Sequence, residues 1–140
     1  MKVLICEPGK YAREAEIDGS LESEQAIVGG MIETVYPWDD SAILVCNDNG
    51  LNERLPLCRQ INEYTVIAGT FFICGDGDCC FASLSDEQLA RYKQEFYKPE
   101  LFFPAPGTEL GIAAVTCTPR QYRYMMGLPE PPKQGQNHNR

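Results

Sequence analysis

The alternation of apolar and polar positions predicts a chain built mainly of short strands. An apolar run over Lys2–Cys6 predicts a central strand that is buried on both faces, and strict alternation over 13–17 predicts a half-buried antiparallel neighbour. The turn residues Glu7–Lys10 between them complete a first hairpin. Further strands are expected over 31–38, 42–46 and 64–74, with a late strand over 110–117.

Glycine and proline mark the places where this strand pattern is interrupted. Gly69, in the middle of 64–74, indicates a bulge or a close backbone approach. The run Asn47–Gly50 is a strong turn signal, because asparagine and glycine tolerate positive φ. Pro56 restricts the extended segment 55–59 to an edge or a loop, because proline has no N–H to donate to a ladder. The exposed edge near Pro56 is compatible with a homodimer.

Two segments carry helix signals. Ser20 is a suitable N-cap for a short helix, which Gly29 ends because glycine suits the left-handed C′ position. A second helix begins at Ser85, which fits a capping box with Gln88. Its apolar face recurs at helical spacing through Leu89, Tyr92 and Phe96. We therefore predict an α+β fold, a mainly antiparallel sheet with two helices in the order ββα, several strands, α.

The composition changes near residue 102 and divides the chain. We expect 1–102 to form one α+β domain. Repeated prolines make 103–127 an irregular C-terminal extension with at most the one late strand. The segment 128–140, LPEPPKQGQNHNR, is polar and proline-rich and is predicted to be a disordered tail.

The composition is that of a soluble globular domain, with 44% hydrophobic and 23% charged residues among 140. No apolar run approaches the roughly 20 residues that cross a bilayer, and the N-terminal segment lacks the pattern of a signal peptide. We therefore expect a cytoplasmic protein that does not contact a membrane.

The net charge of −8 is unevenly distributed. Beyond residue 117, four basic residues against one acid give +3, which leaves −11 for residues 1–117. An acidic body repels phosphates, so we expect no direct nucleic-acid binding by it. The same acidity raises the alternative of a nucleic-acid mimic that occupies a DNA-binding host protein.

Three of the seven cysteines fall in the stretch CGDGDCC, at Cys74, Cys79 and Cys80. These three are weak metal candidates, because their spacing differs from the paired spacing of zinc sites and the one histidine, His138, lies in the tail. A calcium loop would need more acidic ligands. The favoured interpretation is a connecting loop in which Gly75 and Gly77 supply turn geometry. Cys74 then points inward, one of the adjacent cysteines packs under the second helix and the other is exposed.

Catalytic motifs are missing from the sequence. No G-x-x-x-x-G-K-[ST] and no G-x-G-x-x-G is present, which argues against a P-loop or a Rossmann cofactor site. A cysteine or serine nucleophile would need a nearby base, and no histidine precedes the tail. We therefore expect no cofactor and no catalytic residue, while an enzyme with an unrecognised site stays an alternative.

The most distinctive polar segment is 52–62, which places two arginines in an otherwise acidic body. Arginine presents a planar donor fork that suits phosphate or carboxylate. Arg54 and Arg59 are therefore candidates for binding an anionic ligand or an acidic partner, and the opposing interpretation is an exposed loop whose arginines pair with surface acids. Asn62 belongs to the same segment, and Tyr36 and Trp38 are candidates for a stacking surface.

Five motifs in order give the chain a family resemblance. They are KVLICEPGK, AEIDGSLESEQAIVGGMIETVYP, the turn CNDNG…LPL.R, VIAGTFFI, and FASLSDEQLARYKQEF, and together they cover residues 2–97. The chain resembles the domain of unknown function 3846 family, which is common in phage, plasmid and conjugative-element proteins of bacteria. In the family's pattern, Gly often stands at the position of Arg54 and Asn at that of Cys58.

The resemblance implies a protein of a mobile element without an assigned activity. Combined with the missing catalytic motifs, it leads us to expect a small non-enzymatic binding or regulatory protein. Such a protein would bind a host protein or sequester a small anionic, nucleotide-like ligand.

Overall fold

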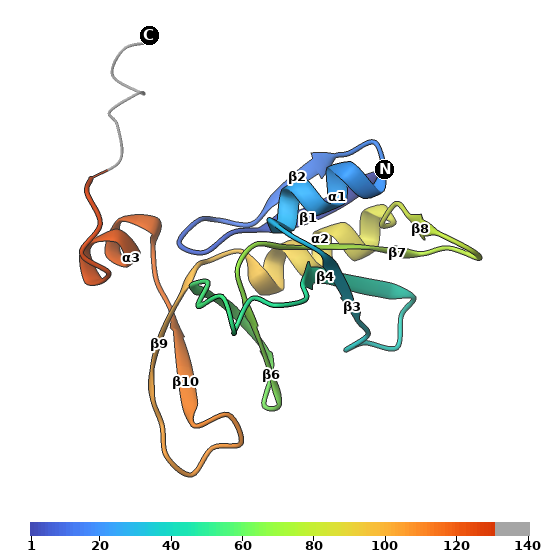
Figure 1. The fold of residues 1–140 in the computed structure, drawn as a ribbon. Coiled ribbons are helices and arrows are strands. Elements are labelled where there is room, and N and C mark those ends of the chain that lie inside the picture. Colours follow the sequence, from blue (N-terminus) through green and yellow to red (C-terminus); the bar gives the residue numbers. More distant parts are fainter. Residues whose placement is uncertain (131–140) are drawn as a thin grey trace, which may run out of the picture.

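The computed structural model describes residues 1–130 of the chain (Figure 1). Six antiparallel strands form the main sheet, in the order β2-β1-β7-β4-β3 with β8 paired to β7. Their bounds are β1 (Lys2–Cys6), β2 (Arg13–Glu16), β3 (Ile32–Val35), β4 (Ala42–Asn47), β7 (Phe71–Asp76) and β8 (Phe81–Ala82). The predicted α+β class, the central place of Lys2–Cys6 and the first hairpin are confirmed.

Each face of the main sheet carries its own apolar core, because successive side chains of a strand point to opposite faces. On one face, Leu4, Leu44 and Ile73 pack with the helix α2 (Asp86–Phe96). The opposite face packs with the helix α1 (Leu21–Val28). The helices therefore cover opposite faces, which explains why β4, between them, is buried along its whole length.

The two predicted helix starts and their caps are confirmed. The Ser20 hydroxyl accepts a hydrogen bond from the Ser23 N–H, and Gly29 ends α1 in the left-handed conformation with φ 77°. Ser85 and Gln88 satisfy each other's backbone N–H groups in the capping box of α2.

The predicted strand over 64–74 is wrong as a single element. The chain forms β6 (Thr65–Ala68), turns at Gly69 with φ 83°, and continues as β7 in the main sheet. β6 instead pairs with β5 (Leu57–Asn62) in a separate two-stranded sheet. Gly69 thus marks a change of sheet and not a bulge. The alternative prediction of a close approach is confirmed, since a Cβ there would lie 2.7 Å from the Leu55 side chain.

The segment after α2 is more ordered than the sequence predicts. β9 (Glu100–Pro104) and β10 (Ile112–Thr116) form a hairpin, and α3 (Pro119–Met125) follows it. The hairpin and β6 project on the same side of the main sheet in Figure 1. β10 confirms the late strand, whereas α3 was not predicted and β9 crosses the expected boundary at residue 102.

α3 contacts the N-terminal hairpin through the side chain of Tyr122. Tyr122 is buried, and its ring lies over Gly9, where an added Cβ would be 2.5 Å from the ring. The extension therefore packs on the turn between β1 and β2. The expected disordered tail falls mostly on 131–140, outside the described residues. Within residues 1–130, the longest helices are too short and too polar to span a membrane.

Candidate functional site

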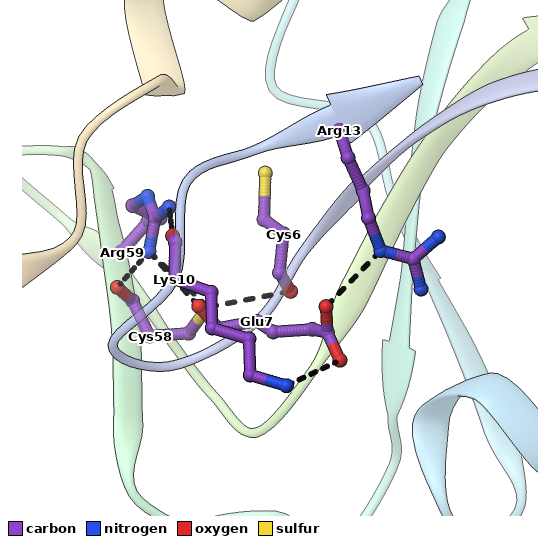
Figure 2. Close-up of polar contacts among 6 residues, drawn as sticks. All are labelled: Cys6, Glu7, Lys10, Arg13, Cys58 and Arg59. Atoms are coloured by element: carbon purple, nitrogen blue, oxygen red, sulfur yellow. Dashed lines mark hydrogen bonds and ion pairs between the residues drawn. The ribbon is translucent and has the colours of Figure 1, made fainter. Parts of the chain in front are cut away.

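Arg59, a predicted ligand-binding residue, is fully buried. Figure 2 shows its polar contacts with Lys10, Glu7 and Cys58. Its Nε donates a hydrogen bond to the Phe96 carbonyl at 3.0 Å, and its Nη2 donates to the Lys10 carbonyl at 2.7 Å. Its Nη1 donates to the carbonyls of Cys58, at 3.0 Å, and Glu7, at 3.4 Å. The guanidinium therefore joins β5 to the 7–10 turn and to the end of α2. The sequence led to two interpretations of Arg59, an exposed anion site and a surface ion pair. Both are wrong in placing the side chain at the surface, because it is buried.

Backbone dipoles stabilise the buried charge of Arg59. In residues 1–130 the guanidinium makes no ion pair with a carboxylate. The Phe96 carbonyl instead belongs to the last turn of α2, where the helix dipole is negative. Burial raises the pKa of the neighbouring Cys6 thiol to about 12, although the Arg59 charge opposes this shift. Burial likewise raises the pKa of Glu100, which accepts a hydrogen bond from the Gln60 N–H at 2.8 Å.

The turn that accepts hydrogen bonds from Arg59 is also held by ion pairs on its solvent-facing side. Glu7 pairs with Arg13 Nε at 3.2 Å and with Lys10 Nζ at 3.8 Å, as Figure 2 shows. These half-exposed pairs contribute little stability individually, because water screens them. Together with Arg59 they hold the 7–13 segment in one conformation, so this polar cluster is structural.

The other predicted ligand residues belong to separate segments of the chain and differ in burial. Trp38 packs in the core against the Tyr92 ring, with centroids 4.5 Å apart. Arg54, Asn62 and Tyr36 are exposed on three different segments of the chain. Arg54 has a φ of 58°, in the left-handed region that glycine favours. The Trp38 ring is thus engaged by Tyr92, and a stacking surface of Tyr36 and Trp38 stays a prediction.

The stretch CGDGDCC is a hairpin and not an open loop. Its first three residues end β7, which pairs with β8 through Gly75 and Asp76. Gly75 and Gly77 lie where the two strands approach closely, since a Cβ at either would meet a backbone oxygen at 2.5 or 2.4 Å. They do not supply positive φ.

The thiols of this stretch point in different directions. Cys74 is buried as predicted, but Cys79 and Cys80 are both exposed, so the prediction that one of them packs under α2 is wrong. Within residues 1–130, no three histidine, cysteine or acidic side chains are grouped as metal ligands. The hairpin therefore gives the weak metal candidates no common centre.

A cleft of about 350 Å³ lies between β6 and the edge of the main sheet, and we call it the β6 cleft. One wall is β6 itself, and the other is made by β3, the end of β4 and the turn that follows β4. Its lining residues are Glu33, Val35, Cys46, Asn47, Asp48, Asn49, Gly50, Leu51, Asn52 and Thr65–Ala68. Sequence reasoning found the 47–50 turn signal but not this cleft.

The turn that borders the β6 cleft is held by asparagine side chains. Asn47, which is buried, donates from Nδ2 to the Val28 carbonyl at 3.2 Å and accepts from the Asn49 N–H at 2.7 Å. Asn52 Nδ2 donates to Asn49 Oδ1 at 2.8 Å. Gly50 lies so close to β6 that an added Cβ would be 2.8 Å from the Ala68 carbonyl oxygen. The cleft is thus preformed.

The β6 cleft combines acidic and amide groups over an apolar floor. Glu33 and Asp48 supply carboxylates, while no lysine or arginine lines it. Burial, assisted by the two carboxylates, raises the pKa of the Cys46 thiol to about 11, so this sulfur is a neutral thiol at neutral pH. The chemistry of the cleft favours binding of a cationic or polar group over nucleophilic attack.

The fold and the cleft together define a small α+β domain with a preformed acidic cleft beside β6. A family model described as a domain of unknown function (DUF3846) matches residues 1–97, and the chain belongs to this family. The β6 cleft lies wholly within the matched residues, whereas β9, β10 and α3 lie beyond them. Comparison with curated proteins and with solved structures found no match.

Proposed function

We propose that this chain is a non-enzymatic binding protein that holds part of a partner protein in the β6 cleft. The observation that carries the proposal is the lining of the cleft, in which Glu33 and Asp48 face a preformed hollow without a basic residue. Its volume of about 350 Å³ fits a few side chains of a partner. The partner is a host protein if the chain acts for a mobile element in the cytoplasm, as the family resemblance suggests.

A protein partner is favoured over a small anionic ligand. Arg59, which would have bound the anion, is buried and its donors are occupied by carbonyls. Arg54 is exposed but does not line the β6 cleft. The carboxylates of the cleft repel phosphate, so a nucleotide-like ligand has no counter-charge there.

Site-specific photo-crosslinking in the cells that produce the protein tests this function. A photoreactive residue replaces Leu51, which lines the cleft and is 66% exposed. The matched control carries it at Leu21 on α1, which is 56% exposed and lies outside the cleft. We expect a discrete crosslinked protein from the Leu51 position only, and its loss on adding Glu33→Arg. Equal crosslinking from both positions, or none, would overturn the proposal.

A further inference from the structure

β6 presents an unpaired strand edge to the β6 cleft. Its one partner within residues 1–130 is β5, which occupies a single edge. All four consecutive residues of β6, Thr65–Ala68, line the cleft. Successive side chains of a strand point to opposite faces, so a hollow lined by consecutive residues runs along the backbone edge of the strand. The cleft therefore follows the side of β6 that has no paired strand, and Gly50 approaches this side only at Ala68.

This edge lacks the features that prevent strands from pairing with other chains. Charged side chains and prolines usually block a free edge. The outer strand β2 has charged side chains, with the sequence REAE, whereas β6 reads TVIA and carries neither a charge nor a proline. An extended segment entering the cleft can therefore form main-chain hydrogen bonds with β6, which is the strand-addition mode of peptide recognition.

The wall opposite β6 determines the charge of such a segment. Glu33 comes from β3 and Asp48 from the turn after β4, so two carboxylates from different elements face the cleft. The asparagines of the turn add neutral polar groups. A lysine or arginine side chain complements this wall, since it supplies N–H donors and the opposite charge.

We propose that the β6 cleft binds an extended basic segment of a partner protein by strand addition to β6, with a lysine or arginine side chain placed between Glu33 and Asp48. This inference rests on the proposed function, because it specifies the chemistry of the partner that the cleft holds. The segment is short, since the cleft volume of about 350 Å³ accommodates only a few residues.

Fluorescence anisotropy with short labelled peptides tests the inference on the purified full-length chain. The probe is a peptide of alternating valine and lysine, compared with a valine–glutamate peptide of the same length. A third peptide keeps the valine–lysine sequence but carries N-methyl groups on alternate residues, which removes N–H donors from one edge. Glu33→Gln with Asp48→Asn neutralises the acidic wall, and Glu22→Gln on the exposed face of α1 is the matched control.

We expect the valine–lysine peptide to bind at least about tenfold more tightly than the valine–glutamate peptide, and N-methylation to remove about tenfold of affinity. The Glu33→Gln/Asp48→Asn chain should lose the lysine preference, whereas Glu22→Gln should keep it. Amide hydrogen exchange should slow within 65–68 when the lysine peptide binds.

The inference and the proposed function fail in different ways. If Leu51 crosslinks a partner but charge and N-methylation have no effect on peptide binding, or the valine–lysine peptide does not bind, strand addition of a basic segment is overturned and the cleft stays a binding site. If no partner is crosslinked from the cleft, the proposed function itself is overturned.

Discussion

The guanidinium of Arg59 donates its Nε hydrogen to the carbonyl of Phe96 at 3.0 Å, and this bond joins β5 to the last turn of α2. The contact spans 37 positions of the chain and is wholly buried. The same side chain reaches the carbonyls of Glu7 and Lys10. One cation therefore links three segments that are distant in sequence, and it supplies a donor to the buried carbonyl of Phe96.

Replacing Arg59 by methionine should destabilise the protein strongly. The change leaves the carbonyls of Phe96 and Lys10 without their donor, and unsatisfied buried groups are costly. We expect the free energy of unfolding to fall by about 3 kcal/mol or more. Arg59→Lys should lose somewhat less, because an ammonium keeps the charge but lacks the planar fork.

Urea unfolding followed by circular dichroism measures these changes. Arg120→Met is the control, because the Arg120 side chain is 82% exposed, and it should shift the free energy by no more than about 0.5 kcal/mol. An Arg59→Met loss as small as that of Arg120→Met would show that the buried contacts do not stabilise the fold.

Replacing Arg54 by glycine should stabilise the protein. Arg54 has a φ of 58°, and a left-handed conformation costs a residue with a Cβ about 1–2 kcal/mol. Glycine removes this strain but adds freedom to the unfolded chain, so we expect a net gain of about 0.5 kcal/mol. Arg54→Ala is the matched control, since alanine keeps the Cβ and should give no gain. Equal urea midpoints for the two variants would contradict the strain argument.

The parts of the fold that were predictable rest on local signals. The caps at Ser20 and Ser85 lie within one turn of the residues they satisfy, so the sequence contains the complete interaction. The same kind of signal was present for α3 and was missed: Thr118 and Gln121 form a capping box, with Pro119 at the first helical position. Local chemistry would therefore have been sufficient to predict α3.

The location of Arg59 and the existence of the β6 cleft depend on distant contacts. The alternation in β5 does not distinguish an arginine facing water from one facing Phe96, because the acceptor is contributed by another element. The cleft likewise requires the chain to change direction at Gly69, between β6 and β7, so that β6 lies beside the turn that contains Asn49. These arrangements depend on tertiary packing, which short-range patterns do not contain.

Replacing Gly9 by alanine should disrupt the packing of α3. The added Cβ would lie 2.5 Å from the Tyr122 ring, and φ at Gly9 is 78°. Gly19→Ala is the matched control, since Gly19 has a φ of 77° but nothing within 4 Å of its added Cβ. We expect Gly9→Ala to lose about 2 kcal/mol more free energy of unfolding than Gly19→Ala. In a Tyr122→Ala background this difference should disappear, and its persistence would exclude Tyr122 as the cause.

Two of the seven cysteines should react rapidly with iodoacetamide in the folded protein. Cys79 and Cys80 are exposed at the tip of the β7–β8 hairpin, whereas the other five are buried. A buried thiol reacts only after local opening. Intact mass measured during native alkylation should therefore stop at two adducts, which peptide mapping should assign to these residues. Early modification of Cys74 would contradict its burial in β7.

Stability should fall when the pH rises above about 9. Burial raises the pKa of Cys6 and Cys74 from 9.0 to about 12 and that of Cys46 to about 11. The unfolded chain therefore releases these protons at a lower pH than the folded chain, so the free energy of unfolding decreases between pH 9 and about 12. Well below pH 9 the thiols are protonated in both states and do not contribute to the pH dependence.

The slope of unfolding free energy against pH, measured by urea titration at several alkaline pH values, tests this linkage. Each buried thiol contributes up to about 1.4 kcal/mol per pH unit within its window. Cys74→Ala removes one of these protons, so it should reduce the slope by up to about 1.4 kcal/mol per pH unit, whatever its effect on absolute stability. Cys79→Ala, at an exposed thiol, is the matched control. Equal slopes for the Cys74 and Cys79 variants would mean that Cys74 ionises as readily in the folded protein as in the unfolded chain.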